Sequence, residues 1–201
     1  MYNPDIHHRR SIRLQDYDYA SCGAYFVTIC VQNRECPFGV VEGGAMEVND
    51  VGRMVQEWWA KLPNKFPGIS LDEFMIMPNH FHGIVVIVGA PPCGCPPLPP
   101  RRCPYSHSKT GQPHGAEKQG QPHGVAPTLG DVIDWFKTMS TNAYIRGVRQ
   151  WDWPPFPGRL WQRNYYERIL RNESELGIAR KYILENPLKW DEDRENPANV
   201  P

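Results

Sequence analysis

The chain has no hydrophobic run long enough to cross a membrane and no excess of charge of either sign. Its 201 residues include 22 lysines and arginines and 22 aspartates and glutamates, so the formal net charge is zero. A membrane span needs about 20 consecutive apolar residues, and residues 1–5 contain no apolar signal region. We therefore expect a cytoplasmic protein with no membrane partner. The zero net charge argues against a protein that coats nucleic acid through bulk charge, but it does not exclude local basic patches.

The six cysteines do not have the spacing of a disulfide framework or of a standard zinc site. Disulfide frameworks are rare in cytoplasmic chains. Cys93, Cys95 and Cys103 lie near several histidines in a proline-rich stretch, but without the spacing of known zinc motifs. A chain of 201 residues is long enough for one domain with a hydrophobic core, but too short for two domains with cores of ordinary size.

A pair of histidines stands at the start of the most apolar stretch. His80 and His82 flank Phe81 and lead into residues 83–88, which read as a buried strand. Because side chains alternate along a strand, both imidazoles point to the same face. Two imidazoles on one strand supply half of a divalent-metal site. A purely structural histidine pair is the alternative interpretation.

Near the C-terminus, the sequence predicts a helix that carries Tyr182 and Asn186 on one flank, since residues four apart are neighbours on a helix. The polar residues 172–175 can cap its start. Pro187 ends it, because proline disfavours the helical conformation of the preceding residue. A phenol and an amide oxygen then project together from the last turn. A buried tyrosine and a capping asparagine would produce the same pattern.

The remaining apolar patterns predict strands at 24–31, 71–77, 81–88 and 160–169, and a small hairpin at 38–41 and 45–48. Asp50 and Thr128 are predicted to cap two further helices, the second with Lys137 on its outward face. This order of elements is the α+β, ferredoxin-like (RRM-like) arrangement. We expect an antiparallel sheet with helices on one face, plus a C-terminal helix that carries the tyrosine.

One stretch interrupts this pattern. Residues 91–127 are rich in proline and glycine and contain Gly-Gln-Pro-His-Gly twice, which predicts a flexible insert. We therefore expect a basic N-terminal arm at 1–22, a domain at 23–190 interrupted by the insert, and a tail at 191–201.

Together, the histidine pair and the tyrosine helix resemble the HUH single-tyrosine transposases, specifically the REP-associated tyrosine transposases. In that family a histidine–hydrophobe–histidine motif lies on a central strand, as His80-Phe81-His82 does here. The family's tyrosine helix ends in an Asn-Pro pair, which Tyr182 and Asn186-Pro187 match. Further segments match in family order, at 8–14, 17–19, 23–28 and 161–167. The resemblance covers residues 7–89 and 126–190, outside the insert and the tail.

The resemblance implies a metal-dependent endonuclease and strand transferase that acts on single-stranded DNA hairpins formed by repetitive extragenic palindromes. Tyr182 would attack the phosphodiester and stay linked to the 5′ phosphate, releasing a 3′ hydroxyl. His80 and His82 would hold Mg²⁺ or Mn²⁺, with Asn186 as the third ligand. Imidazole ligands favour Mn²⁺ over Mg²⁺. A single tyrosine makes one cleavage per site, so a full cycle requires two sites, as in a homodimer, or two sequential reactions.

Basic and aromatic side chains supply candidates for DNA contacts. The resemblance favours phosphate contacts for Arg9, Arg10, Arg13, Arg163, Arg168 and Arg171, with an ordinary solvated surface as the alternative. For Lys137 it favours a place near the DNA backbone or the metal pocket, with a plain surface lysine as the alternative. The candidates for stacking on unpaired bases are Trp151, Trp153, Tyr165 and Tyr166. Packing in the core is the alternative role for these aromatic side chains.

Three other functions fit parts of the pattern. A ferredoxin-like domain can bind single strands without catalysis, through aromatic residues on its sheet, but the first and third strands lack a recognisable aromatic RNA-binding signature. A metal-dependent hydrolase would use the same histidines with water as nucleophile, and would tolerate Tyr182→Phe. A replication initiator or relaxase of the wider HUH group usually carries further domains, for which this chain has no room.

Overall fold

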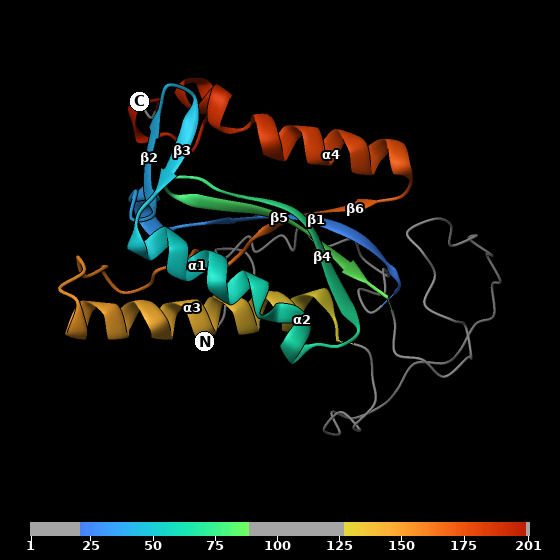
Figure 1. Cartoon of the computed structure of the whole chain (residues 1–201), viewed down its shortest axis with the longest axis horizontal. Helices are drawn as coiled ribbons and strands as arrows, with labels where there is room; N and C mark the ends of the chain where they lie inside the picture. Colours follow the sequence, from blue (N-terminus) through green and yellow to red (C-terminus); the bar gives the residue numbers. More distant parts are fainter. Residues whose placement is uncertain (1–20, 89–126, 200–201) are drawn as a thin grey trace, which may run out of the picture.

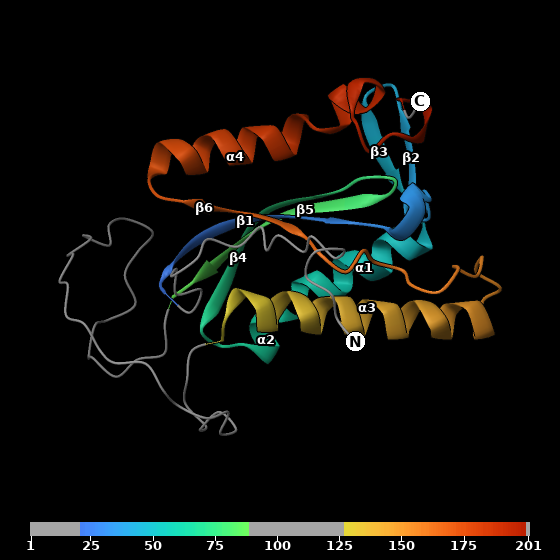
Figure 2. The same cartoon turned by 180° about the vertical axis from the view of Figure 1, so that it is seen from behind.

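The chain folds as a four-stranded sheet with helices on both faces (Figures 1 and 2). The computed structural model describes residues 21–88 and 127–199. Arg9, Arg10 and Arg13 of the predicted basic arm, and nearly all of the insert, lie outside the described residues. No helix in the described part is long and apolar enough to cross a membrane.

The strands, in spatial order, are β4 (Ile69–Ile76), β5 (His80–Ile87), β1 (Gly23–Cys30) and β6 (Tyr166–Leu170). Every neighbouring pair is antiparallel. Figure 1 shows α1 (Asp50–Ala60), the short α2 (Leu62–Lys65) and α3 (Leu129–Gln150) on one face, and α4 (Glu173–Glu185) on the other. A hairpin of β2 (Gly39–Glu42) and β3 (Ala45–Val48) extends from one end. The predicted ferredoxin-like arrangement is confirmed.

Three local features differ from or refine the prediction. Asn49, not Asp50, caps α1, because its side chain accepts a hydrogen bond from the amide of Gly52 at 3.0 Å. Thr128 caps α3 as predicted, in a reciprocal capping box with Asp131. The last strand is shorter than the predicted 160–169, since residues 162–164 turn their carbonyls to a lysine of α3 rather than to a strand.

The sheet separates two apolar clusters of unequal size. The larger one lies under α1 and α3, where Phe81 packs on Trp59 with ring centroids 4.5 Å apart. Gly83 allows this approach, because a Cβ at that position would lie 2.5 Å from a ring carbon of Trp59. The smaller cluster lies under α4 and contains Phe26, Ile84, Leu170, Ala179 and Ile183. A large core therefore supports the sheet from one side, and a small one holds α4 on the other.

Candidate active site

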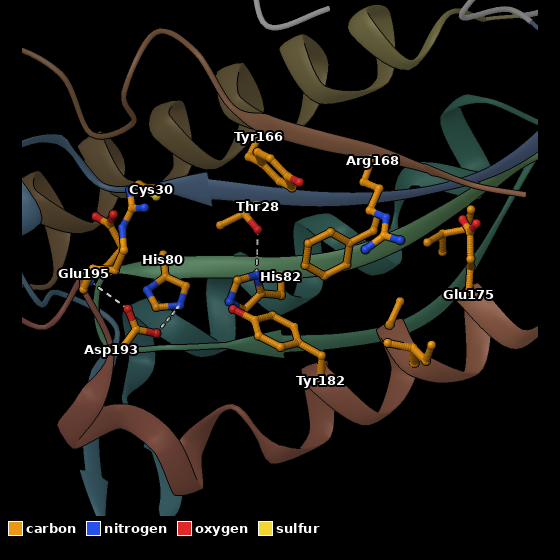
Figure 3. A pocket seen from close by; sticks show the side chains of 15 residues that line it. Thr28, Cys30, His80, His82, Tyr166, Arg168, Glu175, Tyr182, Asp193 and Glu195 are labelled. Carbon is orange, nitrogen blue, oxygen red and sulfur yellow. Dashed lines mark hydrogen bonds and ion pairs between the residues drawn. The ribbon is translucent and has the colours of Figure 1, made fainter.

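A pocket of about 470 Å³ lies between α4 and the sheet (Figure 3). Strands β1 and β5 form its floor, α4 forms one wall, and residues 193–195 close one end. The side chains with reactive or polar groups are Thr28, Cys30, His80, His82, Tyr166, Arg168, Glu175, Tyr182, Asp193, Arg194 and Glu195. Tyr182 and the histidine pair, which are separated by about half of the sequence, therefore share one cavity.

Both histidines face α4 and are almost completely buried, with 1% and 3% of His80 and His82 exposed. Nδ1 of His80 lies 2.9 Å from the side-chain oxygen of Asn79. Because that oxygen can only accept, His80 carries its proton on Nδ1 and keeps a lone pair on Nε2. Nδ1 of His82 lies 2.8 Å from the hydroxyl of Thr28, which can accept in the same way. Such hydrogen bonds orient imidazoles that bind metals through Nε2.

Two buried polar atoms have no hydrogen-bond partner within the described residues: Nε2 of His82, which lines the pocket, and Oδ1 of Asn186, at the end of α4. Buried polar atoms are rarely left unsatisfied unless an ion, water or ligand completes them. Burial lowers the pKa of His80, and burial with the neighbouring His80 holds the pKa of His82 well below 6.5. Both imidazoles are thus neutral near pH 7, which is the form that binds metal.

These residues fit a divalent cation, although no ready-made cluster of charged ligands is present. Among residues 21–88 and 127–199, no three histidine, cysteine or carboxylate side chains gather as a metal cluster. The candidate donors are the two imidazoles of the pocket and the buried amide oxygen of Asn186, which is not among the residues that line the pocket. Asn186 is the C-terminal cap of α4, which ends at Glu185 as expected. The predicted reason does not hold, because Asn186 keeps helical angles (φ −59°, ψ −42°) and Pro187 begins the 3₁₀ helix η2 (Pro187–Glu192).

Tyr182 projects from α4 over the histidine pair. Its ring meets His82 edge to face, with centroids 5.3 Å apart, and Phe26 at 5.8 Å. The side chain is 42% exposed, so the phenol is held on one side and open to solvent on the other. Burial and the negative charge of Asp193 raise the pKa of Tyr182, while the Asn186 amide acts in the opposite direction. The hydroxyl is therefore protonated at neutral pH.

An ion pair fixes α4 beside the sheet, in addition to the small apolar cluster. The guanidinium of Arg180 donates to both carboxylate oxygens of Asp72, at 2.8 and 2.6 Å. Asp72 lies where the register of β4 against β5 shifts, between Leu71 and Phe74. The hydrogen bond from Arg180 also lowers the pKa of Asp72. Because Arg180 stands two residues before Tyr182 on α4, this contact helps to hold the part of the helix that carries the phenol.

A protein of Haemophilus influenzae, described as an uncharacterized protein, is 38% identical over 194 residues, or 96% of each chain. The chain belongs to the same family as that protein. No protein-family model matches it. Among solved structures, a REP-associated tyrosine transposase bound to a REP hairpin is similar with a TM-score of 0.53 and 16% identity, over 90% of this chain and 74% of that chain. The chain thus has the fold of a REP-associated tyrosine transposase.

The basic residues predicted from this resemblance occupy different places. Arg168 lines the pocket from β6. Arg163 and Arg171 are exposed on either side of β6 and are not among the residues that line the pocket. Lys137 does not face outward as predicted. Its ammonium donates to the carbonyls of Gln162 and Arg163 at 2.9 and 3.1 Å, and burial lowers its pKa to about 8.

Other residues of the site were not predicted from the sequence. Asn79 was placed only in a turn, although it directly precedes His80 and has a side chain that can orient an imidazole. The role of Thr28 could be predicted only with knowledge of the register between β1 and β5, which pairs Thr28 with His82. Asp193 and Glu195 fall in the segment predicted as a tail, which is folded beside the histidines through η2 (Pro187–Glu192) and η3 (Pro197–Asn199).

Proposed function

We propose that the protein is a metal-dependent endonuclease and strand transferase that cuts single-stranded hairpin DNA through a 5′-phosphotyrosine intermediate, as in DNA transposition. The observation that carries the proposal is the contact of the Tyr182 ring with His82 in the pocket, where Nε2 of His82 is buried without a partner. The similar solved structure is a transposase bound to a REP hairpin, which supports hairpin DNA as the substrate class.

In the cleavage step, Oη of Tyr182 forms a bond to phosphorus while the bond from phosphorus to the 3′ oxygen breaks. The phenolic proton ends on the leaving oxygen, so one phosphodiester is exchanged for another and a 3′ hydroxyl is released. Rejoining is the reverse reaction with a new 3′ hydroxyl. No ATP is required, because the phosphotyrosine bond conserves the energy of the bond that was cut.

His80, His82 and Asn186 would hold Mg²⁺ or Mn²⁺, which would neutralise charge on the non-bridging oxygens of the scissile phosphate. The chain's own residues do the positioning. Asn79 and Thr28 keep the Nε2 atoms of the two imidazoles available. The raised pKa of Tyr182 means that its proton must be lost during attack rather than before it.

DNA binding would use the open side of the pocket. Tyr166 is 55% exposed and lines the pocket beside Arg168, so a base could stack on its ring while the guanidinium contacts a phosphate. Arg163 and Arg171 would extend this phosphate track along the outer edge of β6. Arg9, Arg10 and Arg13 are proposed to add contacts from the N-terminal arm.

The test is a covalent-adduct assay with single-stranded oligonucleotides taken from palindromes that flank the gene. Wild-type protein with Mn²⁺ or Mg²⁺ should give a slowly migrating protein–DNA band on a denaturing gel. The band should be absent with EDTA and in Tyr182→Phe, but present in Tyr166→Phe, which removes the other phenol of the pocket. Metal-dependent cleavage that persists in Tyr182→Phe would mean that water is the nucleophile. Specific binding without an adduct under any metal would mean a non-catalytic DNA-binding protein.

A further inference from the structure

The carboxylate of Asp193 is oriented toward the histidine pair by the backbone of its own segment (Figure 3). Its Oδ1 accepts a hydrogen bond from the amide of Glu195 at 2.7 Å. Its Oδ2 lies 3.9 Å from Nε2 of His80, which is the nitrogen that Asn79 leaves unprotonated. One oxygen therefore fixes the turn, and the other faces the position where a cation would sit.

The segment that carries Asp193 is fastened to the same residue that orients His80. The side-chain nitrogen of Asn79 donates to the carbonyl of Glu195 at 2.6 Å, while its oxygen accepts from His80. The Glu195 carboxylate is paired with Arg34 at 3.3 Å, which neutralises it. A single buried amide thus positions an imidazole and an acidic segment relative to each other, and leaves Asp193 as the carboxylate that faces the imidazole.

We propose that Asp193 is an additional, anionic ligand of the cation held by His80, His82 and Asn186. The proposal rests on the metal dependence proposed above. Two ligands that bind one metal at about 2.1 Å each can lie up to about 4.2 Å apart. The 3.9 Å between Asp193 Oδ2 and His80 Nε2 falls within that span. His80, His82 and Asp193 do not form a ready-made cluster among the described residues, so binding of the ion would have to draw them together. The unpartnered Nε2 of His82 in the pocket and the unpartnered, buried Oδ1 of Asn186 are independent observations that support an ion at this end of the site.

A carboxylate ligand would change the character of the site. With only two imidazoles and an amide, the donor set is neutral, and attraction for a dication comes from lone pairs alone. One carboxylate supplies a formal negative charge next to the cation, and hard divalent ions favour oxygen ligands. Asp193 would therefore account for much of the affinity for the metal in the absence of DNA.

The experiment is a titration of the metal-free protein with Mn²⁺, without DNA, in which free Mn²⁺ is followed by electron paramagnetic resonance. Asp193→Asn keeps the size and the Oδ1 acceptor of the turn, and should weaken Mn²⁺ binding at least about tenfold. Asp191→Asn removes the same charge from an exposed position two residues away and should change binding less than about twofold. His82→Ala should lose binding altogether. Thermal unfolding without metal checks that each variant is folded.

The outcomes separate this inference from the proposed function. Loss of affinity in His82→Ala but not in Asp193→Asn overturns the inference alone. The inference also fails if Asp193→Asn forms more covalent adduct while its Mn²⁺ affinity is unchanged, because Asp193 would then be an inhibitory contact. If the wild-type protein binds no Mn²⁺, the metal dependence of the proposed function falls as well.

Discussion

The ion pair between Arg180 and Asp72 should determine how firmly α4 is docked on the sheet. Asp72 is 19% exposed and Arg180 37%, so the pair is partly shielded from solvent, and two hydrogen bonds hold it. Apart from this pair, α4 packs on the sheet mainly through the smaller apolar cluster described above. We therefore expect loss of the pair to loosen α4 locally, without unfolding the sheet.

The size of the effect follows from exposure and geometry. Fully exposed ion pairs contribute roughly 0.2–1 kcal/mol, and hydrogen bonds to charged groups contribute roughly 1.5–3 kcal/mol when shielded. For a bidentate pair of intermediate exposure we expect a coupling of about 1–1.5 kcal/mol. Since 1.4 kcal/mol is about a factor of ten in an equilibrium constant, protection of α4 amides from hydrogen exchange should fall about tenfold in Asp72→Asn.

Hydrogen exchange followed by mass spectrometry, with a double-mutant cycle, measures this directly. Asp72→Asn, Arg180→Met and the double variant should lower protection of residues 173–185 by similar amounts, with little further loss in the double variant. Glu173→Gln is the matched control, because it removes a 3.5 Å contact of the same guanidinium with a carboxylate that is 80% exposed. Strictly additive losses, or equal losses in β5 and α4, would refute the argument.

Two further predictions concern the histidine pair. Thr28→Val removes the hydroxyl 2.8 Å from Nδ1 of His82 and should weaken Mn²⁺ binding roughly tenfold or more in a titration; unchanged binding would contradict an orienting role for Thr28. Burial holds the pKa of His82 well below the ordinary value of 6.5 in the folded chain. As the pH falls through 6.5, the imidazole therefore binds a proton in the unfolded chain but not in the folded chain. The free energy of unfolding should therefore decrease between about pH 7.5 and about pH 5.5 by urea denaturation, and decrease less in His82→Gln; an equal decrease in both would show that His82 is not responsible.

The sequence predicted what depends on local pattern. Alternation on the strand that carries His80 and His82 placed both imidazoles on one face, and helical spacing placed Tyr182 one turn before Asn186. The order of strands and helices predicted the ferredoxin-like sheet. Each of these follows from the period of one element or from the succession of elements, so no knowledge of tertiary contacts was required.

What the sequence could not supply depends on contacts between distant segments. Thr28 meets His82 because β1 and β5 pair in one register, and a shift of one residue would turn Thr28 to the other face. Helical periodicity predicted that Lys137 faces outward. It carries no information on distant segments, and so could not predict that the ammonium donates to the carbonyls of residues 162–164. Asp193 follows α4 in a polar stretch, and contacts with distant residues, the hydrogen bond from Asn79 to Glu195 and the pairing of Arg34 with Glu195, bring that stretch to the site.

The two faces of the sheet differ in role: one carries most of the apolar core, and the other carries the candidate active site. The face under α1 and α3 carries most of the buried apolar side chains, so the packing of the strand that bears the histidines depends mainly on this core and less on α4. On the other face, Ala179 and Ile183 of α4 pack with three buried side chains of the sheet and a few partly buried ones, and the Asp72–Arg180 pair adds to this contact, which is smaller than the core of the opposite face. If the proposed function holds, a single-stranded substrate would reach Tyr182 and the histidines through the pocket between α4 and the sheet. Under that proposal, the smaller contact of α4 with the sheet would let the helix adjust to the substrate, while the larger core on the other face keeps the strand of the histidines in place.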